Sequence, residues 1–286
     1  MSEIDFRELK HRGMISQRDG TFSVRLRIAG GYVPSNYLSI LKDVSEKYGV
    51  GNLHLTTRQG IEIPGVNFDE LGEVRSELEA AGIKLGVTGP TVRTVTACQG
   101  DTCQHGIIPA QILAKKIDEE FYGSGGLPHK FKIGITGCPN ACIKPYENDL
   151  GIMGVVKVEF NHEKCTLCGA CAMICPTKAV KIENKVLICD EKVCIGCGKC
   201  AKVCRFDMCG ITKTGYRIYV GGKMGRTPHL GHIAFDFLEG EDKLFNLIKE
   251  TLEFYKQFGN TKERFADTID RVGLGKYQSF IKYSIE

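Results

Sequence analysis

Hydrophobic and polar residues follow two distinct periods in the first fifty residues. Residues 23–31 (SVRLRIAGG) alternate with a period of two, which predicts a strand. Apolar residues then recur at helical spacing from Pro34, which suits a helix start, to Gly49, which ends the predicted helix. The apolar positions of this helix are Leu38, Leu41, Val44 and Tyr48.

The same two periods continue after Gly49. Residues 52–57 (NLHLTT) and 60–65 (GIEIPG) predict two strands. A second helix with one apolar face follows and is closed by Gly82; its apolar positions are Leu71, Val74, Leu78 and Ala81. The order predicts a compact β-α-β-β-α unit.

Two further predicted strands each run into a pair of cysteines. Residues 91–98 (TVRTVTAC) end at the first pair, and residues 130–136 (KFKIGIT) end just before the second, with a helix predicted between them after Pro109. Strand alternation places Lys130 and Lys132 on one face and turns Phe131 toward the core. Loops at strand ends often form functional sites. A C-terminal helix is predicted to pack on the core through Leu244, Phe245, Ile248 and Leu252.

The composition is that of a globular protein with room for about two domains. Hydrophobic residues make up 42% of the 286 residues and charged residues 25%. No apolar run approaches the roughly 18 residues that indicate a membrane span. The N-terminal segment MSEIDFRELKHRG has no apolar core of a secretory signal. We therefore expect a cytoplasmic protein with no membrane span.

The charges exclude a typical nucleic-acid-binding surface. The formal net charge is +4, and 38 basic residues are interleaved with 34 acidic ones. No basic stripe results, so no nucleic-acid partner is expected.

Fourteen cysteines in a reducing compartment indicate metal clusters, because disulfides do not persist there. Eight of them form two C-x2-C-x2-C-x3-C runs, 29 positions apart. This is the two-cluster ferredoxin pattern, in which the fourth cysteine of each run binds the other cluster. The predicted sets for two [4Fe–4S] clusters are Cys165, Cys168, Cys171 and Cys204, and Cys194, Cys197, Cys200 and Cys175. An eight-cysteine zinc site is the alternative, but zinc motifs seldom repeat this spacing.

The other cysteines divide into a candidate third cluster and two without a role. Cys98 and Cys103 precede the predicted central helix, and Cys138 and Cys142 follow it. Either pair alone is weak evidence, but two pairs on separate loops can close around one cubane. The remaining two are expected to be small buried apolar residues, Cys189 and Cys209.

Several segments resemble the siroheme-dependent nitrite and sulfite reductases, from about Gly13 to Gly275. They are LTTRQGIEIPGV, TVRTVTAC, LPHKFKI, GCPNAC, NDLGIMG and GYRIYVGGKMGRTP. With the ferredoxin-type run between them, the chain looks like the anaerobic sulfite reductase C subunit and dissimilatory-type subunits. The resemblance implies an α+β fold: a ferredoxin-like half-domain (residues 1–88), a siroheme and [4Fe–4S] α/β domain (89–158 and 213–286) and an inserted two-cluster ferredoxin domain (159–212).

The resemblance also implies roles for individual residues. Cys98, Cys103, Cys138 and Cys142 would bind a third [4Fe–4S] cluster, and Cys142 would also bridge to the siroheme iron. Arg58, Arg93, Lys130 and Lys132 would line the substrate side of the siroheme as catalytic and cofactor-binding cations, with Gln59 and Asn140 as further cofactor contacts. One departure is the first cysteine pair, which the family commonly spaces as C-x5-C and this chain spaces as C-x4-C. Gly100 can absorb the shorter loop.

The function that the resemblance implies is six-electron reduction of sulfite to sulfide, with electrons relayed through the clusters. Two alternatives remain at this point: nitrite reduction to ammonia, and a siroheme subunit that transfers electrons without turnover. No strand is followed by a G-x-G-x-x-G nucleotide fingerprint, so we expect an external electron-donor protein. Full-length assimilatory members of the family contain two copies of this arrangement, and this chain has one. We therefore expect a homodimer or a complex with a homologous or electron-donating subunit.

Overall fold

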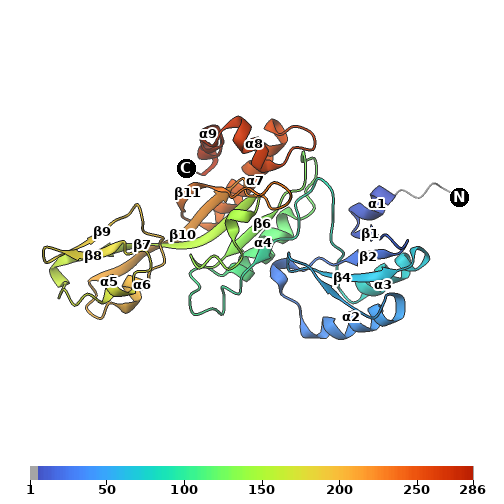
Figure 1. The fold of residues 1–286 in the computed structure, drawn as a ribbon, viewed down its shortest axis with the longest axis horizontal. Helices are drawn as coiled ribbons and strands as arrows, with labels where there is room; N and C mark the ends of the chain where they lie inside the picture. The colour runs from blue at the N-terminus through green and yellow to red at the C-terminus, as the bar shows by residue number, and fades with distance from the viewer. Residues whose placement is uncertain (1–5, 286) are drawn as a thin grey trace.

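The structure is a computed structural model that describes residues 6–285. Figure 1 shows three units, with the N-terminal unit at one end, a central unit in the middle and a small unit at the opposite end. Two long strands, β7 (Leu150–Phe160) and β10 (Cys209–Val220), join the central and small units. Across the described part of the chain, no helix combines the length and the hydrophobicity that crossing a membrane requires.

The N-terminal unit is a four-stranded antiparallel sheet, in the order β1-β2-β4-β3, with two long helices packed on it. Its core is made of fully buried residues from the sheet, such as Val24 and Ile63, and from the helices, such as Val44 and Leu78. Its elements are α1 (Phe6–His11), β1 (Met14–Ser16), β2 (Phe22–Arg25), η1 (Ala29–Gly31), α2 (Ser35–Tyr48), β3 (His54–Leu55), β4 (Ile61–Val66), η2 (Phe68–Glu70) and α3 (Leu71–Ala80).

Both predicted helices of this unit are confirmed, and the strands are confirmed with changed bounds. Helix α2 starts directly after Pro34 and ends before Gly49. One predicted apolar position is wrong, since Leu38 is 51% exposed. Strand β2 ends at Arg25 and is shorter than predicted, and Gly30 adopts positive φ in the 3-10 helix that follows. Strand β1 was not predicted, because three residues are too few to show a period.

The central unit contains a five-stranded mixed sheet in the order β11-β10-β7-β6-β5. Neighbours among β5, β6 and β7 are parallel, whereas β10 is antiparallel to both of its neighbours. Helix α4 connects β5 to β6 and begins directly after Pro109, as predicted. The elements are β5 (Thr96–Ala97), α4 (Ala110–Phe121), β6 (Ile133–Thr136), η3 (Pro145–Glu147), β11 (His232–Leu238), α7 (Glu241–Phe258), α8 (Phe265–Val272) and α9 (Leu274–Ile285).

Aromatic packing joins the segment directly before β6 to the C-terminal helices. Phe131 is fully buried, and its ring centroid lies 5.9 Å from that of Tyr255 and 5.2 Å from that of Phe265. Phe131 also forms a parallel bridge with Val92, although the predicted strand at residues 91–98 is regular only at β5. The predicted inward orientation of Phe131 is confirmed, so its two lysine neighbours lie on the other face of the strand.

The small unit is formed by the chain segment between β7 and β10, which are neighbouring strands of the central sheet. Cys209 at the start of β10 pairs with Phe160 at the end of β7, and the enclosed segment folds on its own core. Buried residues of that core include Val180 and Leu187, and Cys209 is 4% exposed. The elements are η4 (His162–Lys164), α5 (Ala170–Ile174), β8 (Val180–Glu183), β9 (Val186–Cys189) and α6 (Lys199–Val203).

Candidate functional site

A cavity of about 640 Å³ lies between the N-terminal and central units. The four cations singled out in the sequence, Arg58, Arg93, Lys130 and Lys132, all line it. Within the described residues, no Asp or Glu side chain lines this cavity. A concave surface with cations and no acidic group concentrates small anions.

The β3–β4 turn positions Arg58 at the junction of the two units. Thr56 closes the turn, because its backbone N donates to Gly60 O over 2.8 Å and its Oγ1 accepts from Gly60 N over 3.0 Å. The Arg58 guanidinium donates to Asn148 Oδ1 (2.8 Å) and to Thr94 O (3.1 Å). Burial lowers the pKa of Arg58 to about 10, so the side chain remains charged at neutral pH.

Arg93 is held by backbone carbonyls rather than by an acid. Its Nη1 donates to Val87 O (2.9 Å) and its Nη2 donates to Gly89 O (3.0 Å). Its Nε is buried and has no hydrogen-bond partner among residues 6–285. Burial lowers the pKa of Arg93 to about 10, with Arg25 adding to the shift. A buried donor without an acceptor is rare, so this atom is suited to an incoming ligand.

Lys130 and Lys132 line the cavity with ammonium groups that can gain or lose a proton. Burial lowers the pKa of Lys132 to about 8, and the nearby Arg58 charge acts in the same direction. Burial also lowers the pKa of Lys130, followed by the charges of Arg264 and Arg93. No acceptor for either ammonium is found in the described range of the chain. Lys132 can therefore bind an anion as a cation and release a proton near neutral pH.

One buried carboxylate, that of Asp149, supports the positively charged residues around the cavity through hydrogen bonds. Asp149 is fully buried and accepts hydrogen bonds from Arg264 Nη2 at both oxygens (2.8 and 3.0 Å) and from Lys132 N (2.9 Å). Burial raises the pKa of the Asp149 carboxyl, and Arg264 opposes the rise. Sequence reasoning missed Asn148, Asp149 and Arg264 as site residues. The signal that was available is the polar pair in NDLGIMG, directly before an apolar strand.

Gln59 and Asn140 lie in different surroundings. The Gln59 amide donates to Ala97 O (2.8 Å) and accepts from Ala97 N (3.0 Å), so it joins the β3–β4 turn to the strand that precedes Cys98. Gln59 adopts positive φ (59°). Asn140 lies in the loop after β6 and is exposed. The predicted cofactor contacts of both residues stay predictions.

The four cysteines of the two separated pairs lie together at the ends of β5 and β6. Cys98 Sγ accepts a hydrogen bond from Gly137 N over 3.0 Å. Burial raises the pKa of the Cys138 thiol, and nearby Cys98, Cys103 and Cys142 add to the rise. Cys103 and Cys142 are exposed. Four thiols on two adjacent loops form a donor set that suits one cubane cluster.

The cysteines of the small unit lie in two groups. A small hollow is lined by one complete predicted set, Cys165, Cys168, Cys171 and Cys204, which joins cysteines from both runs. Burial raises the pKa of Cys189, and the neighbouring thiols that add to the rise are those of Cys194, Cys200 and Cys175. Cys175 therefore lies with the second run. This crossed arrangement is the one that the two-cluster ferredoxin spacing predicts.

Family models match both large units. Residues 15–81 match the nitrite/sulfite reductase ferredoxin-like half domain, and residues 88–284 match the nitrite and sulphite reductase 4Fe-4S domain. The fold resembles the crystal structure of dissimilatory sulfite reductase I, with a TM-score of 0.74 and 23% identity, covering 91% of this chain and 69% of that one. It also resembles the Mycobacterium tuberculosis NirA protein, with a TM-score of 0.67 and 15% identity, covering 100% of this chain and 47% of that one.

Curated relatives include proteins of different length. The coenzyme F420-dependent sulfite reductase of Methanocaldococcus jannaschii is 35% identical over 94% of this chain, which spans 44% of that protein. An uncharacterized protein of the same organism is 35% identical over 96% of this chain and 95% of its own length. The C subunit of the Salmonella typhimurium anaerobic sulfite reductase is 33% identical over 60% of this chain and 54% of its own length. The chain belongs to the nitrite and sulfite reductase family, whose members bind siroheme and a [4Fe–4S] cluster.

Proposed function

We propose that this chain is a sulfite reductase or its catalytic subunit, which reduces sulfite to sulfide with six electrons. The observation behind the proposal is the charge of the cavity, which Arg58, Arg93, Lys130 and Lys132 line without an acidic residue in the described range. Sulfite is a small anion, and each added electron increases the negative charge that fixed cations stabilise. Two relatives with 33–35% identity are named as sulfite reductase proteins, which favours sulfite over nitrite.

The residues of the cavity fit siroheme, which carries several carboxylates. The unpaired Arg93 Nε and the ammonium groups of Lys130 and Lys132 offer donors to carboxylates or to a bound oxyanion. Cys142, exposed in the loop after β6, offers the thiolate that would ligate the iron. When bound, siroheme supplies an iron centre that binds the substrate and passes electrons to it.

The chain's own residues would perform two tasks. Arg58 and Arg93 are anchored by carbonyl and amide oxygens, so their charges stay in fixed positions during the reaction. Such preorganised charges stabilise developing negative charge without reorganisation. Lys132, whose pKa burial lowers to about 8, would deliver protons to the oxygens that leave as water.

Electrons would enter through the small unit from an external donor protein. Its eight ferredoxin-type cysteines would hold two [4Fe–4S] clusters, and the set ending in Cys142 would hold a third beside the siroheme. The low reduction potentials of such clusters suit the transfer of electrons to siroheme and sulfite. Because the assimilatory members of the family have two copies of this arrangement and this chain has one, the active form is proposed to be a homodimer or a complex with a homologous or electron-donating subunit.

Steady-state assays of anaerobically purified, iron-loaded protein test this function. With a reduced viologen as donor, we expect sulfite to be consumed with sulfide as product, and a higher kcat/KM for sulfite than for nitrite. A higher kcat/KM for nitrite would assign the chain to the nitrite reductases instead. Reduced clusters that are not reoxidised by either anion would identify an electron-transfer subunit without turnover.

Substitution of single cysteines should separate the electron path from the catalytic centre. The parent is expected to contain about twelve cluster irons and one siroheme iron, from three clusters and one macrocycle. Cys168→Ser should lower the content of cluster iron per chain and leave the siroheme absorption in place. Cys142→Ser should instead disturb siroheme and its adjacent cluster together. Both side chains are exposed, so neither substitution opens the hydrophobic core. Iron analysis and visible spectra check the result; equal losses in both variants would indicate a folding defect instead.

A further inference from the structure

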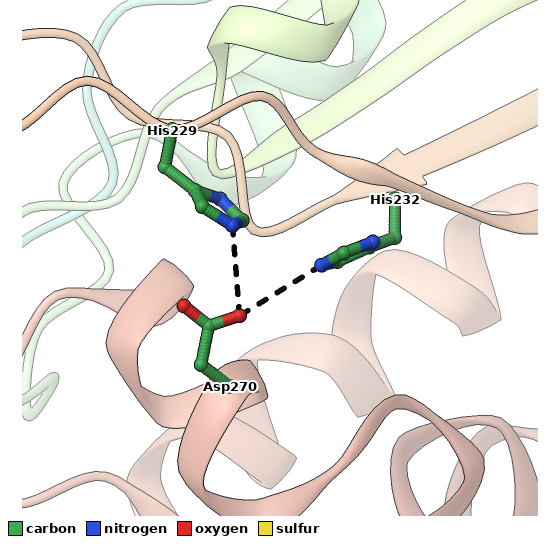
Figure 2. Close-up of side chains that lie close together, drawn as sticks. All are labelled: His229, His232 and Asp270. Atoms are coloured by element: carbon green, nitrogen blue, oxygen red, sulfur yellow. Dashed lines mark ion pairs between the residues drawn. The ribbon is translucent and has the colours of Figure 1, made fainter.

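Two histidines and an aspartate converge at the edge of the central unit, apart from the cysteines. His229 lies in the loop after β10, His232 begins β11 and Asp270 lies on α8. Figure 2 shows both imidazole rings directed at the same carboxylate oxygen. The ligand atoms of the three side chains all lie within 4.8 Å of one another.

The hydrogen bond of His229 defines which ring nitrogen is available. Its Nδ1 lies 2.8 Å from Gly221 O. A carbonyl oxygen only accepts, so Nδ1 must donate, and in the neutral ring the lone pair of Nε2 faces Asp270. Metal-binding histidines commonly use one nitrogen for the metal and donate the other N–H to a carbonyl or carboxylate. His229 is therefore oriented as a ligand.

The spacing of the three groups fits a shared cation better than direct hydrogen bonds. Asp270 Oδ1 lies 3.6 Å from His229 Nε2 and 3.7 Å from His232 Nε2. Both distances exceed hydrogen-bond range. Ligand atoms about 2.0–2.1 Å from a tetrahedral zinc ion are about 3.3–3.4 Å apart, so the three groups, whose ligand atoms lie within 4.8 Å of one another, would enter its coordination sphere by moving inward.

We propose that His229, His232 and Asp270 bind a divalent cation of the zinc type. Two imidazole nitrogens and one carboxylate oxygen form a donor set that zinc commonly binds. The side chains are between 29% and 48% exposed, so solvent can supply a fourth ligand and the ion can enter directly. This site uses none of the cysteines or cavity cations described above.

The cation would fasten helix α8 to the loop that supports the cationic cavity. The loop between β10 and β11 contacts the turn before β7, because Gly221 N donates to Asp149 O (3.0 Å) and Gly231 N donates to Tyr146 O (2.7 Å). At Gly222 the approach is so close that a Cβ atom would lie 2.2 Å from Tyr146 O. Lys223 in the same loop already forms an ion pair with Asp267 of α8. A metal at Asp270 would add a second link between the loop and the helix.

Zinc binding by the cluster-loaded protein tests the proposal, since loaded clusters keep the cysteines occupied. Anaerobic protein is washed with EDTA, incubated with Zn²⁺, desalted and analysed for zinc and iron. The parent is expected to retain about one zinc per chain, with only nitrogen and oxygen ligands at about 2.0–2.1 Å in zinc X-ray absorption spectra. The midpoint of thermal unfolding should rise with zinc, because only the folded state presents the site.

Matched variants locate the ion. His232→Ala and Asp270→Asn should each weaken zinc binding by more than about tenfold. Loss of a residue that only hydrogen-bonds to a metal ligand already lowers metal affinity by about 10- to 100-fold, and these two substitutions remove a ligand itself. His54→Ala is the control, because His54 also pairs with a carboxylate, at 3.1 Å from Glu62, but lies in the N-terminal unit. Unchanged circular dichroism and iron content would show that the variants are folded. Sulfur ligands at about 2.3 Å, or equal zinc retention by parent and both variants, would overturn the proposal.

Discussion

Replacement of Lys132 by methionine is expected to lower kcat/KM for sulfite by about 10- to 100-fold. Methionine keeps much of the side-chain length and removes the charge. The ammonium lines a cavity without acidic groups in the described range, so its loss removes a charge-assisted contact worth about 1.5–3 kcal/mol. Steady-state reduction of sulfite by reduced viologen measures the effect, and Lys130→Met is expected to change in the same direction.

The pH profile distinguishes a proton donor from a passive charge. Burial lowers the pKa of Lys132 to about 8, so the ammonium is protonated below that pH and loses its proton above it. Anion binding and proton delivery both need the protonated form, so kcat/KM of the parent should fall as pH rises through about 8. Lys132→Met should lack this fall, whereas the titration of sulfite itself affects both proteins equally.

Two control variants separate an effect on the cavity from general effects of lost charge or lost stability. Lys115→Met removes a charge of the same kind from an exposed position on α4 and should leave kcat/KM unchanged. Phe131→Leu, on the buried face of the same strand, should lower stability more than it changes the substrate step. Parent-like sulfite reduction by both lysine variants would show that neither ammonium group takes part in the substrate step.

Local signals made the helices predictable. Pro34 and Gly49 bracket α2, and Pro109 precedes α4, because proline favours a helix start and glycine a helix end. The gathering of the cations was predicted through the family resemblance and strand alternation, and Phe131 confirms that alternation. Leu38 shows the limit of periodicity, since it lies on the face that the period predicts to be buried and is 51% exposed.

The contacts that sequence reasoning missed join segments far apart in the chain. Arg264 reaches Asp149 across 115 positions, and Asn148 accepts from Arg58 across 90. No period or spacing reports such pairs, because tertiary packing alone brings them together. The cysteines differ, since the chemistry of a cubane constrains their spacing along the chain. The crossed partnership of Cys204 with the first run was predictable for that reason.

Replacement of Asp149 by asparagine is expected to destabilise the protein by about 3–5 kcal/mol, the usual cost of breaking a buried ion pair. The side chain is fully buried and accepts from Arg264 Nη2 at both oxygens. Asparagine keeps the volume but leaves the partly buried guanidinium without a counter-charge and turns a donor toward it. The midpoint of thermal unfolding, followed anaerobically by circular dichroism, should fall by roughly 6–20 °C.

A double-variant cycle distinguishes the ion pair from a general packing defect. Arg264→Met alone should also destabilise, because it leaves the buried carboxylate unpaired, but the two substitutions together should cost less than the sum of the single effects. Asp236→Asn provides the matched control: its side chain is 78% exposed and lies 3.4 Å from Arg217, so its loss should cost less than about 1 kcal/mol. Since Lys132 N also donates to Asp149, sulfite kcat/KM should fall with stability in the single Asp149 variant. Additive losses in the double variant would show that the two charges do not support each other and that the cationic wall of the cavity is held by packing alone.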